Sequence, residues 1–183
     1  MSTEHLVLGQ TEDFITGEAI PDTYDERARQ KIARLLVEDK GFSRSDVTVR
    51  RPLKLSIDGV AATVRVDFVL HVGQAAFAVI IFGPGSLVSR ERPAVAAARL
   101  LEPYVVPYVV VTNGQDAEVL ETKTGTIVAE GLEEIPSKDQ ACLQMKGITL
   151  ERLSEIRLEK ERRILFAFDV LAEKECDEYT CSL

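Results

Sequence analysis

A glycine-rich turn with two arginines close behind it is the first candidate for chemistry. Residues 83–86 read Gly-Pro-Gly-Ser, and Arg90 and Arg92 follow. Backbone N–H groups at a helix start, together with nearby cations, can bind a phosphate group. However, the segment lacks both the Gly-Lys-Ser/Thr ending of a P-loop and a G-x-G-x-x-G pattern. We therefore favour the interpretation that it is simply a turn.

Positive charge is concentrated in the middle of the chain. The 183 residues carry a net charge of −8, but residues 27–99 contain thirteen basic and six acidic residues, so this stretch is +7 and the rest is −15. The overall charge opposes binding to a phosphate backbone, and few aromatic residues are interleaved for base stacking. We therefore favour a solvated surface of mixed charge over a nucleic-acid surface. The latter would use Arg27, Lys31, Arg34, Arg50, Arg51, Lys54, Arg90 and Arg92.

Cysteine and histidine give no zinc or triad motif. Cys142, Cys176 and Cys181 are odd in number, and no second cysteine pair or nearby histidine completes a zinc site. His71 lies at a predicted hairpin turn, which leaves no Ser-His-Asp arrangement. A reducing cytoplasm fits this cysteine content best.

Composition indicates a globular protein without membrane association. Hydrophobic residues make up 45% and charged residues 28% of the chain, which are ordinary values. The longest apolar runs, residues 75–82 and 105–111, are far shorter than the roughly 20 residues that span a bilayer. The N-terminus is acidic where a signal peptide is basic. We expect a cytoplasmic protein with one domain and an appendage.

Apolar periodicity and turn residues predict the order αβββαβββ, followed by helices. Thr23 and Glu26 form a capping box at the first helix, while Asp58-Gly59 and Thr124-Gly125 are hairpin turns. Residues 1–20 show no periodicity and are expected to be an acidic arm. The predicted elements are a helix over 25–40, strands over 47–57, 60–70 and 75–82, a helix over 89–101, strands over 105–112, 118–120 and 127–129, and helices over 139–145 and 150–174.

The second predicted strand has an alternating pattern. Its even-numbered residues from Val60 to Leu70 are apolar and should share one face, which places Arg65 and Asp67 on the other. Asp67 stands in a valine-rich strand, and its structural interpretation is an ion pair with Arg65 or with an arginine of the first helix.

The last predicted helix has apolar residues at helical spacing, but its middle, residues 157–163, is polar. Packing on its own domain and a homodimer contact remain open alternatives.

Three segments resemble the N-terminal domain of type I restriction enzyme R subunits. They are Glu26-Arg27-Ala28-Arg29-Gln30, Val64-Arg65-Val66-Asp67-Phe68-Val69 and Pro107-Tyr108-Val109-Val110-Val111-Thr112-Asn113-Gly114. The resemblance implies a prokaryotic α/β protein with a restriction-endonuclease-like αβββαβ core and a mixed sheet. The implied domain covers 21–137, between the arm of residues 1–20 and a C-terminal helical extension over 138–183.

The resemblance also implies where a PD-(D/E)XK metal site would lie. Asp67 matches the aspartate that ends the second strand of that family. The Glu-x-Lys of the third strand corresponds to Ile81-Phe82-Gly83, so a metal ligand and a cation are both replaced. Glu26 stands where some relatives have a carboxylate on the first helix that contributes to the site, so the resemblance implies it as a second candidate.

Loss of these groups predicts a catalytically degenerate domain. Mg²⁺ requires carboxylate oxygens in near-octahedral geometry, and isoleucine offers none. We therefore expect no cofactor and a binding or regulatory module, whose partner is DNA or a restriction-modification protein.

Two other functions stay open. A Mg²⁺- or Mn²⁺-dependent endonuclease could have a migrated site, with Asp67 as metal ligand, Glu26 beside it, and Arg65, Arg90 or Arg92 facing the phosphate. Alternatively, the chain is a structural homodimer through its last helix, with no role in nucleic-acid binding.

Overall fold

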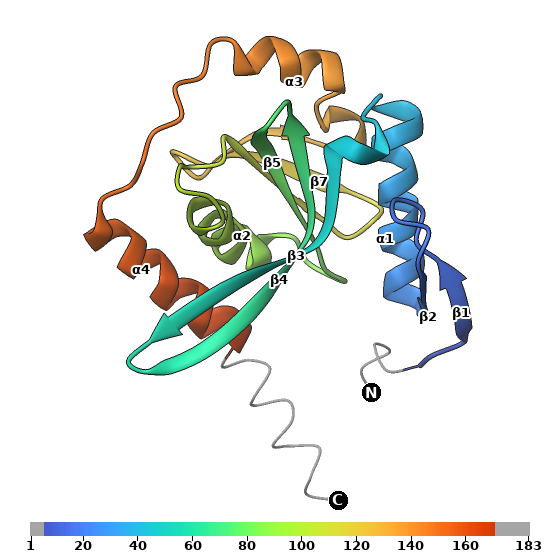
Figure 1. Ribbon diagram of the computed structural model, residues 1–183, viewed down its shortest axis with the longest axis horizontal. Coiled ribbons are helices and arrows are strands. Elements are labelled where there is room, and N and C mark those ends of the chain that lie inside the picture. Colours follow the sequence, from blue (N-terminus) through green and yellow to red (C-terminus); the bar gives the residue numbers. More distant parts are fainter. Residues whose placement is uncertain (1–5, 171–183) are drawn as a thin grey trace, which may run out of the picture.

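A single mixed sheet of six strands forms the centre of the molecule (Figure 1). The computed structural model describes residues 6–170. The strands lie in chain order, and all neighbours are antiparallel except β5 and β6, which are parallel and joined through a helix. The predicted α/β class, mixed sheet and αβββαβββ order are confirmed. The strands are β3 (Val47–Ile57), β4 (Val60–Val72), β5 (Ala75–Phe82), β6 (Tyr108–Thr112), β7 (Ala117–Glu121) and β8 (Thr126–Glu130).

Helices cover both faces of this sheet. On one face, α1 (Tyr24–Arg34), extended by a π-helical turn (Leu35–Asp39), packs with α3 (Lys138–Met145). On the other face lie α2 (Val88–Leu100) and α4 (Glu155–Leu165), which is followed by a second π-helical turn (Phe166–Val170). Single-turn 3-10 helices at Arg44–Asp46 and Leu132–Glu134 complete the elements outside the N-terminal segment.

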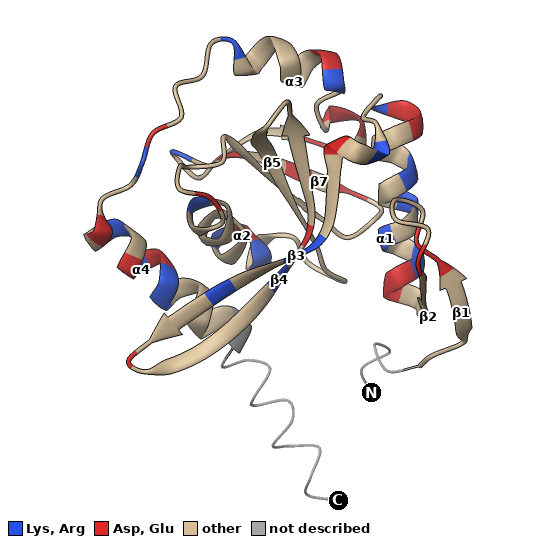
Figure 2. Ribbon diagram, viewed as in Figure 1, with Lys and Arg blue, Asp and Glu red and all other residues tan. Residues whose placement is uncertain are grey.

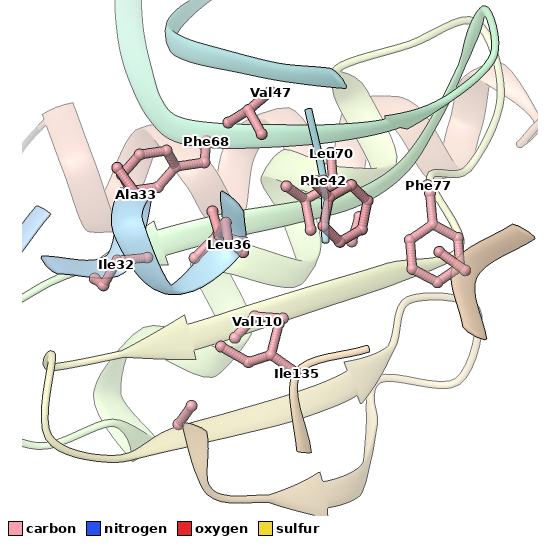
Figure 3. Close-up of a cluster of buried hydrophobic side chains, with 14 of the residues drawn as sticks. Ile32, Ala33, Leu36, Phe42, Val47, Phe68, Leu70, Phe77, Val110 and Ile135 are labelled. Atoms are coloured by element: carbon pink, nitrogen blue, oxygen red, sulfur yellow. The ribbon is translucent and has the colours of Figure 1, made fainter. Parts of the chain in front are cut away.

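The first helix forms where its cap and apolar residues predict it. The Thr23 hydroxyl accepts a hydrogen bond from the Glu26 backbone N–H at 3.1 Å. The Glu26 side chain turns to other partners and does not close the predicted capping box. Ile32 and Leu36 are fully buried, and they pack with Phe42 and Phe68 in the cluster of Figure 3.

The hairpin of β3 and β4 is longer than the sheet it joins. Asp58 and Gly59 have φ values of 49° and 83°, as a tight two-residue turn requires. Pairing of β4 with β5 reaches only to Phe68 opposite Ile80, and the hairpin beyond that point leaves the sheet (Figure 1). We call this outer part, residues 50–66, the ribbon.

The departure of the ribbon corrects the prediction that one face of this strand is continuous. Val64 and Val66 pack in the cluster around α2, whereas Phe68 and Leu70 pack in the cluster around α1. Alternation predicts faces only within a regular sheet, and β4 changes its surroundings at Asp67.

The N-terminal acidic segment, which we expected to be an arm, contains a second small sheet. Its strands are β1 (Gly9–Glu12) and β2 (Ala19–Asp22), which lie beside α1 (Figure 1). Asp13, in the loop between them, is 1% exposed and accepts the backbone N–H groups of Ile15 and Thr16 at 2.9 and 2.8 Å. The segment thus has an ordered, charged anchor.

The last helix starts later than predicted. Ser154 caps α4, and residues 150–154 are not helical because this segment instead runs beside residue 105, where the Val105 N–H donates to the Glu151 carbonyl at 2.9 Å. In its described part, α4 packs on α2. The end of the predicted helix and Cys176 and Cys181 lie outside the described residues. No helix in residues 6–170 is long and apolar enough to cross a membrane.

Candidate functional site

A polar cavity opens where the ribbon separates from the sheet. Its volume is about 320 Å³, near the lower limit of small-ligand pockets. The ribbon forms one wall, the end of β5 forms the floor, and α1 and α2 supply the remaining sides. The charged residues that line it are Arg29, Arg65, Asp67 and Arg90.

Asp67 lies in this cavity with both carboxylate oxygens engaged. Oδ1 accepts a hydrogen bond from Arg29 Nε at 2.7 Å, and Oδ2 accepts the Phe82 backbone N–H at 2.8 Å. The residue is 6% exposed. The structural interpretation, an ion pair with an arginine of the first helix, is therefore what the geometry shows. The Arg29 guanidinium also lies over the Phe82 ring, 4.9 Å from its centre.

Glu26 does not line the cavity. Its Oε1 accepts hydrogen bonds from Arg50 at 2.9 Å and from Gln30 at 2.8 Å, while Arg29 stands 3.9 Å from its other oxygen. The Arg29 side chain thus contacts both Glu26 and Asp67, and the two carboxylates do not converge on a common open position.

The Glu26 network continues to the N-terminal hairpin through Arg50. Arg50 pairs with Asp13 at 2.7 Å as well as with Glu26. Burial by itself would raise the pKa of Asp13, but hydrogen bonds from the Thr16 backbone and from Arg50 hold it below its ordinary value. Burial would lower the pKa of Arg50, but the two carboxylates raise it above its ordinary value. These charges stabilise one another, and Asp13, Glu26 and Arg50 do not line the cavity.

The positions that the resemblance aligns with a Glu-x-Lys, at the end of β5 and just after it, present no ligand. Ile81 lines the cavity with an apolar side chain, and Gly83 has none. The guanidinium of Arg90 lies over Gly83, and a Cβ atom at position 83 would overlap it. Arg90 Nη2 donates to the Pro84 carbonyl at 3.3 Å, while its Nε is buried without a hydrogen-bond partner among residues 6–170.

The structure separates the three arginines that the sequence suggested for phosphate contact. Arg65 and Arg90 line the cavity, and Arg65 is exposed and forms no ion pair within the described part of the chain. Arg92 instead pairs with Glu161 of α4 at 2.7 Å. Arg29 was not among the phosphate candidates, although it contributes a third arginine to the cavity.

Most other basic residues of the central stretch are paired. Figure 2 shows acidic segments beside basic ones on α1 and α4. Five of the eight residues considered for a nucleic-acid surface form ion pairs, which favours a surface of mixed charge outside the cavity. The pairs are Arg27 with Asp22, Arg34 with Glu38, Arg50 with Asp13 and Glu26, Arg51 with Glu102, and Arg92 with Glu161.

A second charged centre, which the sequence did not reveal, joins α4 to α2. Glu161 is 0% exposed and accepts hydrogen bonds from Arg92, Arg99 and Arg157 at 2.7, 2.9 and 2.9 Å. Burial would raise the pKa of Glu161, but these arginines hold it below its ordinary value. Only Arg157, four residues earlier on the same helix, could have been matched to Glu161 from spacing.

The comparison with protein families agrees with this architecture. The model described as "Type I restriction enzyme R protein N terminus" matches residues 24–136. The chain belongs to this family. No curated protein and no solved structure matches it.

A type I restriction enzyme R N-terminal domain with a PD-(D/E)XK site would need residues that can bind a divalent metal ion. Within residues 6–170, no group of three His, Cys, Asp or Glu side chains could hold a metal ion. Mg²⁺ takes six oxygen ligands in near-octahedral geometry, and both Asp67 oxygens are already hydrogen-bonded. The residues present therefore do not fit the metal of a PD-(D/E)XK site.

Proposed function

We propose that this domain is a nuclease-like module that binds DNA without cleaving it. The observation that carries the proposal is the composition of the cavity, where arginines lie at the place of a metal site. Three arginine side chains face one carboxylate, and that carboxylate is neutralised by Arg29. Such a site favours an anion and disfavours a divalent cation.

The loss of cleavage is supported by what replaces the catalytic groups. Removing one preorganised group that stabilises transition-state charge costs roughly 10²- to 10³-fold in rate. At Ile81 and Gly83 the cavity lacks both the second carboxylate and the lysine of the family pattern. Arg90 brings a cation to the same place, but without a metal ligand beside it the chemistry is incomplete.

DNA is the partner most consistent with the family and with this charge. A site that has arginines in place of a metal can still hold a phosphate group, because phosphate contacts contribute affinity without chemistry. The overall charge of −8 limits such binding to a local surface, and the cavity is the candidate for it.

Cleavage and binding should be measured together. Supercoiled and single-stranded DNA are incubated with Mg²⁺ or Mn²⁺ and either the wild type or Asp67→Ala, purified in parallel to reveal contaminating nuclease. Binding of a labelled short duplex and single strand is measured by fluorescence anisotropy over a range of salt concentrations. We expect no nicking that depends on Asp67, together with salt-sensitive binding of DNA.

Two results would contradict the proposal. Metal-dependent nicking that disappears in Asp67→Ala would mean that the domain is an endonuclease with a rebuilt site. Absence of DNA binding at low salt, where phosphate contacts are strongest, would remove DNA as the partner.

A further inference from the structure

We infer that the cavity between the ribbon, β5, α1 and α2 binds a phosphate group directly through Arg65 and Arg90, beside the Arg29–Asp67 ion pair and without a metal ion. This inference rests on the proposed function and deepens it, since it names the chemical group and the side chains that would hold it.

Charge in the cavity is positive. Arg29 and Asp67 neutralise one another at 2.7 Å, which leaves Arg65 and Arg90 without a carboxylate partner in the part of the chain that the structure describes. Apolar side chains, including Ile81 and Pro93, form part of the lining beside these cations. Charges interact more strongly beside such side chains than in water, so an anion that enters would be held more firmly than on an open surface.

Donors are left over on Arg90. Its Nε is buried without a partner among the described residues, and the only side-chain hydrogen bond that Arg90 forms there, from Nη2 to the Pro84 carbonyl, is long at 3.3 Å. A buried N–H without an acceptor is costly, and native proteins satisfy nearly all of them. Phosphate oxygens match the planar fork of a guanidinium, so a phosphate could supply the missing acceptors after a small rotation of this side chain.

Space for the guanidinium is provided by Gly83. Its backbone is outside the positive-φ region, so alanine would be tolerated by the chain conformation itself. A Cβ at this position would nevertheless overlap Arg90. Glycine therefore lets the Arg90 guanidinium lie against the backbone here, and a Cβ would make this flexible side chain shift. Gly83 and Arg90 act together to place a cation at the end of β5.

A phosphate in this cavity could come from two sources, a phosphodiester of DNA or a small phosphate ester. The shared chemistry is a tetrahedral oxyanion held by arginine forks. The volume of about 320 Å³ admits such a group.

The test uses the full chain and inorganic phosphate as probe, with affinity measured by calorimetry. The variants are Arg65→Ala, Arg90→Ala and Gly83→Ala, and the control is Arg152→Ala, an exposed arginine that does not line the cavity. Loss of one charge-assisted hydrogen bond should weaken phosphate binding by about tenfold or more in each of the three. Gly83→Ala is the sharpest variant, because it displaces Arg90 and leaves the net charge unchanged.

Unchanged phosphate affinity in both Arg90→Ala and Gly83→Ala, or no phosphate binding to the wild type, would overturn the inference. Thermal unfolding of each variant establishes that it is folded. If Arg90→Ala does not fold, the phosphate affinity of Arg65→Ala, which removes an exposed side chain, still tests the inference.

A parallel titration with labelled DNA distinguishes the source and separates the two proposals. If DNA and phosphate binding weaken in the same variants, the ligand is a DNA phosphodiester. If phosphate binds through these arginines and DNA does not bind, the cavity inference stands with a small phosphate ester as ligand, while the DNA-binding function fails. If DNA binds equally well to all variants and phosphate does not bind, the DNA-binding function stands and the cavity inference fails.

Discussion

At the scale of single residues, Asp67 has a structural task that its sequence position does not reveal. The backbone pairing of β4 with β5 ends next to it, and its carboxylate accepts the N–H of Phe82 that would otherwise lack a partner there. The same side chain holds Arg29 against the sheet. The aspartate that the resemblance assigns to a metal site thus serves in this structure as a hydrogen-bond acceptor.

This role predicts the stability of Asp67→Asn. The amide keeps the shape but removes the charge opposite Arg29, so we expect the free energy of unfolding to fall by about 1–3 kcal/mol, as measured by urea denaturation. The matched control is Asp58→Asn at the exposed hairpin turn, where asparagine suits the positive φ and stability should change little. Equal or greater stability of Asp67→Asn would instead indicate a carboxylate held at a cost for metal binding.

At the scale of elements, Glu161 attaches α4 to the rest of the protein. In Glu161→Gln, Arg99, which is 4% exposed, keeps its charge and its bonds to the Thr122 and Lys123 carbonyls but loses its carboxylate partner. We expect a loss of about 3 kcal/mol at neutral pH, because removing one member of a buried pair leaves the other uncompensated. Glu159→Gln on the same helix, whose ion pairs are exposed, should cost less than about 1 kcal/mol.

The pH dependence of this difference has a definite sign. The pKa of Glu161 is lower in the folded protein than its ordinary value of about 4.3, so its contribution is complete above that pH and is lost as the pH falls through the folded-state pKa. Urea denaturation of the wild type and Glu161→Gln should therefore give converging stabilities in acid. A difference that persists unchanged well below pH ~4 would show that the charge is not responsible.

Local signals explain which elements the sequence could predict. The turn at Asp58-Gly59 and the cap at Thr23 depend on neighbouring residues alone, and both lie where expected. The start of α4 and the N-terminal hairpin depend on distant partners instead. Glu151 bonds to Val105, and Asp13 pairs with Arg50. No spacing rule connects such residues.

The candidate site was predictable to a similar degree. That Ile81 and Gly83 stand where the resemblance implies a carboxylate and a lysine could be read directly from the sequence. The sequence could not predict that Arg90 fills the space above Gly83, because this contact depends on how α2 lies across the end of β5. Arg92, two residues later on the same helix, has a different direction and reaches Glu161. Arg90 and Arg92 point to different places because of how α2 is rotated about its own axis relative to the sheet. The sequence does not specify this rotation.

At the scale of the whole molecule, segments outside the family match complete its charge pairing. Residues 24–136 carry Arg50 and Arg99, whereas the carboxylates that pair with them at Asp13 and Glu161 lie before and after that range. The family core of this protein is thus held at both ends by buried anions from its own flanks.

The ribbon has a consequence for local opening of the protein. Before Asp67, over residues 60–66, β4 pairs only with β3, and a two-stranded hairpin has marginal stability by itself. Its outer part contacts α4 and the following turn, so undocking of α4 should loosen the wall that carries Arg65. Hydrogen–deuterium exchange should therefore be faster at ribbon amides in Glu161→Gln than in the wild type, with β5 and β6 remaining protected. Equal exchange in the two proteins would mean that the ribbon opens independently of α4. Faster exchange in Glu161→Gln would mean that α4, a helix outside the family core, controls access to the cavity.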